Sequence, residues 1–499
     1  MYIQKLLLVV LLPLTSAAET ILGAYIFHRH GDRTPKSLPP VGLTDLGYSE
    51  VYSSGQYHRQ RYVDAAAAAS SQIAGISTDT VVQGQITLSA SDDITLMTSA
   101  QGFAQGLYPP VGNGASSSQI LRNGTTIQTP LDGYQLIPVH SVSAGSGSES
   151  AGWLQGSTGC ANAEKSSNEY FTSEEYMALL ASTGDFYKSL FPVINGTFSA
   201  NQTSFQNAYT SGLFILLFFV ASLTHTQSQS VYDLLNVAEI HNSSLNTDIL
   251  TDAAFFQTRT LADNHEYNLA YNASSPIRAI AGATLAAQIL GALNQTITSS
   301  GQSKLNVQFG SYGSFFSFFG LAQLPAANSG FFGIPDYASF MAFELVTNSS
   351  TTPFPASADI SVRFLFHNGT VSNSSGPIEY PLFGQQETVL PWTTFSSEMS
   401  KFAIGNQNDW CTACGNTTGI CAAAAATTPS SASTHDSSMS NAVAGVIGAM
   451  VTLAVVLGAE LLFIFVGGLT LKKKRTALLG NGGRVVGKDA EHSSLESGV

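Results

Sequence analysis

Basic residues and cysteines are scarce in this chain of 499 residues. Only 20 lysines and arginines stand against 33 aspartates and glutamates, so the formal net charge is −13. So acidic a chain does not suit nucleic acid as a partner and does not attract phosphorylated ligands over long distances. A phosphate site would therefore have to be a local cluster of arginines. The sequence also contains no repeat of fixed period.

The four cysteines predict two disulfide bonds, because an even number in an oxidising compartment is typical of paired thiols. Three connectivities are open. The spacing Cys411-x-x-Cys414 also fits a redox or metal pair, but no second pair or histidine follows at zinc spacing. We expect no metal and no cofactor. The four residues are Cys160, Cys411, Cys414 and Cys421.

The first 18 residues have the pattern of a secretory signal peptide. Lys5 supplies the positive charge, Leu6–Leu14 is apolar, and Ser16-Ala17-Ala18 provides the small residues of a cleavage site. We expect the mature chain to begin at Glu19.

A second apolar stretch, residues 442–471, is long enough to cross a membrane and is interrupted by one charge, Glu460. Basic residues 472–475 follow at once, which marks residues 472–499 as cytoplasmic. The sequence thus predicts a single-pass type I membrane protein of the secretory pathway, at the cell surface or the vacuolar membrane. Because a carboxyl group inside a membrane helix is unfavourable, Glu460 suggests a partner helix.

Residues 19–421 form the predicted ectodomain, and the stretch rich in Ser, Thr and Ala at 422–441 reads as an O-glycosylated stalk. Glycosylation needs exposed acceptor asparagines, so the density of Asn-x-Ser/Thr sites indicates a glycoprotein. The acceptors are Asn123, Asn195, Asn201, Asn242, Asn272, Asn294, Asn348, Asn368, Asn373 and Asn416.

Hydrophobic patterning predicts an α/β ectodomain. Ile21–Phe27 and Ile360–His367 are typical of strands, while Ser49–Ala69 and Ile277–Leu293 favour helices. Leu213–Leu223 is too short to span a membrane and reads as a buried helix.

The most specific feature, Arg29-His30-Gly31-Asp32-Arg33-Thr34-Pro35, follows the first predicted strand directly. Open α/β sheets place ligands at such strand ends. Guanidinium groups match phosphate oxygens and stay charged at every relevant pH. A histidine nitrogen between them can attack phosphorus and form a phosphohistidine. The alternative is a basic surface turn.

This RHGxRxP segment resembles the signature of the histidine acid phosphatases, the branch that includes the phytases. The resemblance covers most of residues 19–421. It implies a three-layer α/β domain of the histidine-phosphatase (phosphoglycerate-mutase-like) type with a mainly helical cap, and a phosphorylated or other small anionic ligand. Further similar blocks are Leu43-Thr44-Asp45-Leu46-Gly47, Ser99-Ala100-Gln101-Gly102-Phe103, Pro138-Val139-His140 and Pro335-Asp336-Tyr337-Ala338-Ser339.

By that resemblance His30 is the catalytic nucleophile, and Arg29 and Arg33 bind phosphate. The rest of the family's catalytic set is missing. Ile94 or Thr95 stands where the family has a third arginine. Tyr312 replaces its second histidine, and Gly313 replaces the aspartate that protonates the leaving group. Glycine cannot donate a proton, so hydrolysis of alkyl esters should suffer most.

Three substitutes for the missing acid come from the sequence alone: Asp32, Glu344 and the pair His265-Glu266. Each has a structural alternative. Asp32 would pair with a neighbouring arginine, Glu344 with a buried arginine, and His265-Glu266 would lie on a helix surface.

The remaining histidines and aromatic residues favour structural roles. We expect His28 to pack beside its strand and His140 to be a hydrogen-bonded structural residue. We expect the phenylalanines of residues 315–319 to lie in the core.

These observations leave three hypotheses: an acid phosphatase relative that binds phosphate with weak or lost activity (a pseudoenzyme in the extreme case), an active phosphomonoesterase using phospho-His30, and a structural cell-surface glycoprotein.

Overall fold

The computed structural model describes residues 19–68, 71–142, 157–207, 231–372 and 374–422. The predicted signal peptide, membrane helix, cytoplasmic tail and nearly all of the stalk lie outside these residues, as does the helix predicted at Leu213–Leu223. Among the described residues, Pro276–Thr298 is long and apolar enough to span a membrane, but 61% of its most apolar window is buried within the protein. That segment is a core helix.

A mixed sheet forms the centre of the fold, in the strand order β10-β8-β7-β1-β6-β2-β5, with β9 paired to β8. β1 pairs in parallel with β6 and antiparallel with β7, so it lies in the middle and is buried on both faces. The strands predicted at Ile21–Phe27 and Ile360–His367 are confirmed as β1 and β8. The bounds are β1 Thr20–Arg29, β2 Ile86–Ser91, β5 Val139–Val142, β6 Leu305–Gly310, β7 Phe340–Thr347, β8 Ile360–His367, β9 Ile378–Glu379 and β10 Val389–Pro391.

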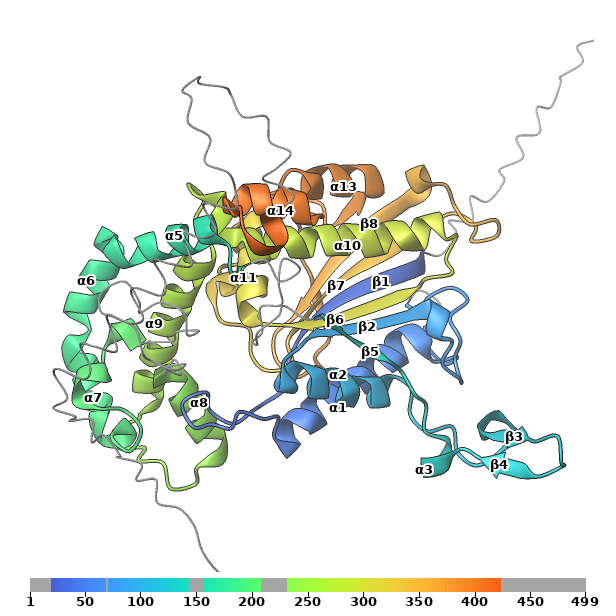
Figure 1. Cartoon of the computed structure of the whole chain (residues 1–499), viewed down its shortest axis with the longest axis horizontal. Helices are drawn as coiled ribbons and strands as arrows, with labels where there is room; N and C mark the ends of the chain where they lie inside the picture. Colours follow the sequence, from blue (N-terminus) through green and yellow to red (C-terminus); the bar gives the residue numbers. More distant parts are fainter. Residues whose placement is uncertain (1–18, 69–70, 143–156, 208–230, 373, 423–499) are drawn as a thin grey trace, which may run out of the picture. The chain divides into compact units, whose positions relative to one another are not determined.

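Helices cover both faces of this sheet (Figure 1), which gives the expected three layers. One face packs against α1 and α2, and the other packs against α10, α11 and α13. The helix predicted at Ile277–Leu293 is confirmed as a short 3-10 turn followed by α10. The bounds are α1 Asp45–His58, α2 Ile94–Leu107, α10 Ile280–Thr298, α11 Tyr312–Leu321 and α13 Trp392–Ser400.

The helix predicted over Ser49–Ala69 ends early: α1 stops at His58 and a π-helical turn runs on to Val63. The reason lies in the carbonyl groups that a longer helix would use. The Ile73 amide binds the Tyr62 carbonyl, and the Gln72 side chain binds the carbonyls of Val63 and Asp64.

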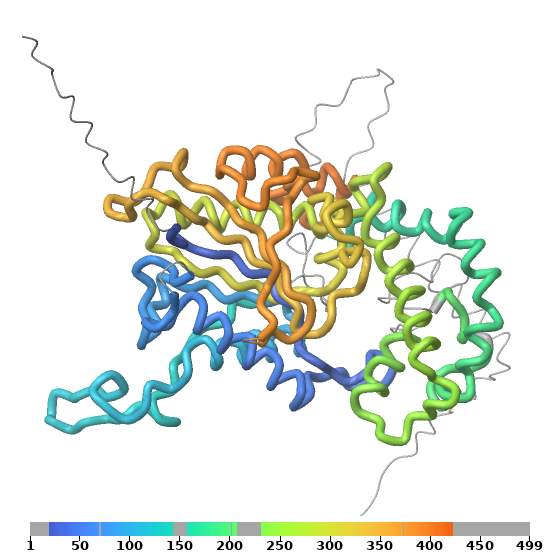
Figure 2. Tube along the Cα trace, turned by 180° about the vertical axis from the view of Figure 1, so that it is seen from behind, coloured from blue at the N-terminus to red at the C-terminus, as the bar shows by residue number. Residues whose placement is uncertain are grey.

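Residues 161–207 and 231–270 contribute a separate group of helices with its own apolar cluster, and this group is the predicted cap (green in Figure 2). Arg278 fixes it to the sheet domain by donating to the Asn268 carbonyl at 2.7 Å and to the Ser166 carbonyl. The cap helices are α5 Ala161–Glu169, α6 Glu174–Ser182, α7 Gly184–Ile194, α8 Val231–His241 and α9 Asp252–Ala270. The remaining elements are β3 Ser118–Ile120, β4 Thr126–Gln128, α3 Pro130–Gly133, α12 Leu324–Ala327 and α14 Gln407–Cys414.

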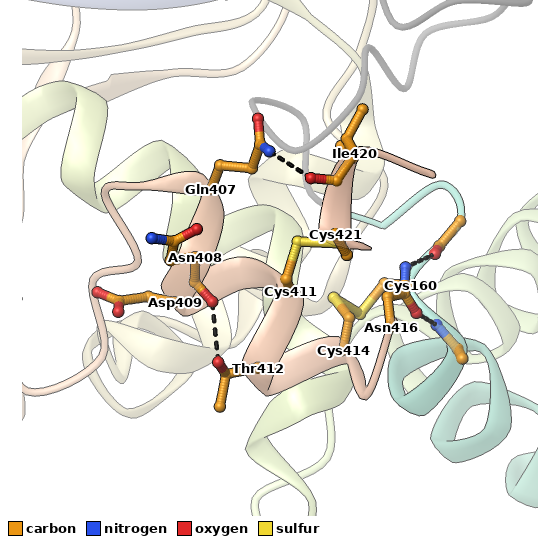
Figure 3. The surroundings of a disulfide bond; sticks show 12 residues. Cys160, Gln407, Asn408, Asp409, Cys411, Thr412, Cys414, Asn416, Ile420 and Cys421 are labelled. Carbon is orange, nitrogen blue, oxygen red and sulfur yellow. Dashed lines mark hydrogen bonds between the residues drawn. A yellow bond between two sulfur atoms is a disulfide. The ribbon is translucent and has the colours of Figure 1, made fainter. Parts of the chain in front are cut away.

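Both predicted disulfides form, and their pairing selects one of the three connectivities: Cys160–Cys414 and Cys411–Cys421 (Figure 3). Cys411 and Cys414 therefore do not pair with each other, and the redox or metal alternative is wrong for this structure. Asn416 strengthens the junction because its side chain donates to the Gly159 carbonyl at 2.6 Å. The first cap helix is thus tied to the last helix of the sheet domain.

Glu344 lies fully buried in β7, and two guanidinium groups converge on it. It accepts bonds from Arg61 at 2.7 and 2.9 Å, from Arg363 at 2.6 and 2.8 Å, and from the Tyr62 hydroxyl at 2.6 Å. The expected pairing with arginine is confirmed, but Arg61 and Arg363 are only partly buried. A carboxylate so fully engaged cannot serve as the missing acid.

His28 is also structural, as expected. Its ring stacks on Phe309 and Phe340, and Nε2 lies 2.7 Å from the Ser54 hydroxyl. Burial lowers its pKa to about 4, so the imidazole is neutral over the ordinary pH range. The phenylalanines of residues 315–319 are fully buried in the core, which confirms their predicted role.

Candidate active site

The signature turn leaves β1 at the centre of the sheet and packs against the start of α1. This contact is so close that only glycine fits on either side. A Cβ on Gly31 would lie 2.2 Å from the Gly47 carbonyl oxygen, and one on Gly47 would lie 2.0 Å from that of Asp32. Thr44 caps α1 by accepting from the Gly47 amide. Two of the sequence blocks quoted above therefore meet at one backbone junction.

His30 has the geometry of a nitrogen nucleophile. Its Nδ1 lies 2.8 Å from the Gly31 carbonyl, and because a carbonyl only accepts, Nδ1 carries the proton. Nε2 then presents a lone pair, and it is buried without a hydrogen-bond partner among the described residues. Burial, followed by the charges of Arg29 and Arg33, holds the pKa of His30 well below its ordinary value. The imidazole is therefore neutral and able to attack.

Arg29 and Arg33 flank this ring, and both are almost fully buried. The Arg29 guanidinium donates to the Pro335 carbonyl and lies 4.7 Å from the Tyr337 ring centroid. Its Nε has no hydrogen-bond partner among the described residues. The ring of Tyr337 lies 5.5 Å from that of His30, so this tyrosine lies beside both Arg29 and His30.

An internal carboxylate already occupies Arg33. Asp233 of α8 accepts two bonds from its guanidinium, at 2.6 and 3.2 Å, and a third from the Lys36 amide at 2.8 Å. Burial alone would raise the pKa of Asp233, but the charge and hydrogen bonds of Arg33 hold it below its ordinary value. The ionised carboxylate therefore occupies the two terminal nitrogens of the Arg33 guanidinium.

A second contact ties α8 to the turn. His241 places Nε2 2.6 Å from the Asp32 carboxylate, which also accepts from the Thr44 hydroxyl. The expectation that Asp32 pairs with a neighbouring arginine is wrong. Both signature arginines have other partners, and the cap supplies a histidine instead.

Replacing Asp233 with Asn should tighten the binding of inorganic phosphate by about tenfold, because it removes a competing charge, and two unit charges about 4 Å apart interact by roughly 1 to 4 kcal/mol. Asparagine keeps an oxygen that can hold Arg33 in place. Isothermal titration measures the effect.

The matched control for this change is Asp336→Asn, since Asp336 pairs with Arg259 at 2.7 Å rather than with a signature arginine. An equal gain in both variants would indicate general electrostatics rather than competition at Arg33. Weaker binding in Asp233→Asn would mean that Asp233 organises the site instead of occupying it.

Tyr312 and Gly313 lie in the first turn of α11, directly after β6. The Arg29 guanidinium lies 5.4 Å and Lys36 Nζ 5.8 Å from the Tyr312 ring centroid, so this residue does border the site. Space does not require glycine at position 313. A Cβ there would have only the Ser311 hydroxyl within 4 Å, at 3.8 Å.

Glu266 is joined to this position. The Tyr312 hydroxyl donates to one of its oxygens at 2.8 Å, and His265 Nδ1 lies 3.1 Å from the other. Both His265 and Glu266 are buried, so the prediction of a helix surface is wrong. The apolar face of α9 packs against the cap aromatics, and the polar pair turns inward with it.

The place of the third arginine supplies no cation. Ile94 is 62% exposed, and Thr95 is buried at the start of α2, where its amide donates to Asp93. The prediction that His140 is a hydrogen-bonded structural residue is wrong. Its side chain is exposed on the edge strand β5, forms no hydrogen bond with the described residues and lines a different cavity. Within the described ranges, no three His, Cys, Asp or Glu side chains converge as metal ligands.

A cavity of about 210 Å³ adjoins the turn. Three of its lining residues, Arg29, Asp233 and Tyr337, also belong to the site just described. Sequence reasoning missed Asp233, His241 and Glu50, because nothing in their spacing indicates contact with the signature. The other lining residues are Glu50, Tyr232, Asn236, Ile240, Ile334, Asp336, Gly369 and Thr370.

Comparison with solved structures supports the fold through the first structure reported below. The chain is similar to the phytase of Citrobacter braakii, with a TM-score of 0.50 and 14% identity over 80% of this chain and 100% of that one. The Hafnia alvei phytase has a TM-score of 0.49 and 15% identity, over 80% of this chain and 98% of that one. The multiple inositol polyphosphate phosphatase of Bifidobacterium longum, in complex with inositol hexasulfate, has a TM-score of 0.44 and 12% identity, over 79% of this chain and 94% of that one. Likeness at such identities concerns the fold alone.

No curated protein matches the chain in sequence. A family model does: that of the histidine phosphatase superfamily (branch 2) matches residues 38–367. The signature turn immediately precedes the matched residues. Because the match spans well over half of the chain and the turn carries a poised histidine between two arginines, the chain belongs to the histidine phosphatase superfamily, branch 2.

Proposed function

We propose that this protein is a membrane-anchored, glycosylated member of the histidine acid phosphatases that binds phosphomonoesters and hydrolyses them weakly or not at all. The observation that carries the proposal is His30: a buried, neutral imidazole with a bare Nε2 between two guanidiniums. The predicted signal peptide, the apolar stretch 442–471 and the ten acceptor asparagines support the route and the anchorage.

The chemistry available to this site has two steps. Nε2 of His30 attacks phosphorus, the ester P–O bond breaks, and the leaving oxygen departs with the bonding pair. Water then attacks the phosphohistidine, the P–N bond breaks, and inorganic phosphate leaves. Arg29, and Arg33 once it is released from Asp233, would balance the charge on the phosphoryl oxygens.

The weakness of the activity follows from the missing groups. Loss of one electrostatic donor typically lowers a rate by about 10²–10³, and loss of a general acid by about 10²–10⁴. Ile94 and Thr95 bring no charge, Tyr312 brings no positive charge, and Gly313 donates nothing. An alkoxide needs a proton in order to leave, whereas a phenoxide needs it far less.

A second candidate function, full phosphomonoesterase activity, is favoured by the Tyr312–Glu266 hydrogen bond. Tyr312 stands where the family has its second histidine, and a proton could pass from its hydroxyl, which donates to Glu266, to the leaving oxygen. This candidate requires that alkyl esters turn over as well as aryl esters.

The decisive test compares aryl and alkyl phosphates on the full-length protein from acidic to neutral pH. We expect slow turnover of the aryl ester, little or none of the alkyl ester, and an acid-labile phosphoryl label on the protein. His30→Ala should abolish turnover and label, whereas His140→Ala, which changes an exposed histidine, should abolish neither. Equal turnover of both esters would establish the second candidate. Absence of both turnover and phosphate binding would refute the proposal.

A further inference from the structure

The cavity beside the signature turn is small. Its volume of about 210 Å³ lies below the roughly 300–1,000 Å³ of pockets that hold drug-sized ligands. A phosphoryl group attached to a short organic chain would fit, but a large leaving group would not. The organic part of the ligand would therefore be compact.

The cavity is acidic for a phosphate-binding protein. Three carboxylates from separate elements line it: Glu50 of α1, Asp233 of α8 and Asp336 before β7. Arg29 is the one basic residue among the lining residues that the structure describes. Even when Arg33 and Arg259, the salt-bridge partners of the two aspartates, are counted, positive and negative charges only balance. A polyanion would find no excess positive charge here.

Glu50 differs from the two aspartates. Within the described part of the chain it forms no salt bridge; its Oε2 accepts from the Asp32 amide at 2.7 Å, and the Thr370 side chain also binds it. Burial raises the pKa of this carboxyl group, which indicates that a positive charge nearby would stabilise its ionised form. The charge of Asp32 raises the pKa of Glu50 further, and the charge of Arg29 lowers it, although Arg29 and Glu50 form no salt bridge.

Arg29 is a positively charged residue of the same cavity. It forms no salt bridge within the described residues, and its buried Nε has no hydrogen-bond partner there. A guanidinium and a carboxylate that act on each other electrostatically, but form no salt bridge, therefore line one cavity. The rings of Tyr232 and Tyr337 line it too, and aromatic faces favour organic cations.

We propose that the ligand is a small zwitterionic phosphomonoester, in which the phosphoryl group binds at Arg29 and His30 and a cationic amine binds at Glu50 between the two tyrosines. This inference rests on the proposed function and names its substrate class. Glu50 is then a specificity-determining residue, and esters carrying several phosphates are poor ligands.

Choline phosphate and 3,3-dimethylbutyl phosphate provide the test, because they share a shape and differ in one positive charge. Titrated into the full-length protein, choline phosphate should bind about five- to tenfold more tightly, as expected of one partly buried charge pair. In Glu50→Gln, which keeps an acceptor for the Asp32 amide, the two affinities should become equal. Asp185→Asn, a fully exposed acidic residue on α7, should retain the preference.

Equal affinities in the wild-type protein would overturn the inference and leave the proposed function intact. A wild-type preference that survives in Glu50→Gln would overturn the role of Glu50. Failure of both esters and of inorganic phosphate to bind would refute the proposed function itself. The wild-type comparison decides the substrate class even if Glu50→Gln does not fold.

Discussion

Gly313→Asp should raise the hydrolysis of an alkyl phosphate by about 10²-fold or more, because it supplies a general acid to a site that keeps its nucleophile. The position has room: a Cβ meets only the Ser311 hydroxyl, at 3.8 Å, and the backbone is helical. Half-burial beside β6 favours the protonated carboxyl group that an acid must have. Initial rates with aryl and alkyl esters at acidic pH measure the effect.

The matched control is Gly313→Asn, which has the same size and no titratable proton. The aryl ester should gain much less than the alkyl ester, since its leaving group needs little protonation. An equal gain from asparagine would show that the side chain acts by packing or by polarity. No gain from a folded Gly313→Asp would mean that proton donation does not limit turnover, or that Tyr312 and Glu266 already supply it.

Glu344→Gln should lower the free energy of unfolding by about 3–5 kcal/mol, the loss typical when one partner of a buried ion pair is removed. The glutamine cannot satisfy the five donors that converge on this carboxylate. Arg61 would lose its salt bridge with Glu344, while Arg363 would keep Glu19 at 2.6 Å. Unfolding of the ectodomain by denaturant, followed by fluorescence, measures the change in free energy.

Glu379→Gln is the comparison, because Glu379 contacts the same Arg363 at 3.6 Å but is 41% exposed. Exposed pairs contribute only about 0–1 kcal/mol, so this variant should unfold almost as the wild type does. Similar losses in both variants would show that the stabilisation resides in Arg363 and not in the buried carboxylate.

Much of the sheet domain could be predicted from sequence because its signals are local. β1 and β8 are apolar runs with clear ends, and the signature turn follows β1 without a gap. The central part of the site, His30 with Arg29 and Arg33, is contiguous in the chain. For the same reason Tyr312 and Gly313 could be identified as departures from the family pattern.

The rest depends on contacts over long distances in sequence. Asp233 lies 200 residues from Arg33, and its own neighbourhood is an ordinary helical segment. Likewise, Asp32 pairs with His241 of the cap and not with the expected arginine. The sequence suggests Glu266 as a candidate acid but predicts that it lies on a helix surface. The periodicity of α9 does not show that other parts of the fold bury this residue. Packing of the cap on the sheet domain decides all three.

The pairing of Cys160 with Cys414 has a consequence for limited proteolysis. The two cysteines are 254 residues apart in sequence, and the segment between them includes the whole described cap and most of the sheet. A protease that cuts once anywhere between residues 161 and 413 leaves two fragments joined covalently. Such a nicked protein would migrate as one band until a reductant is added, and its two halves would still hold the signature turn and α8 in one molecule.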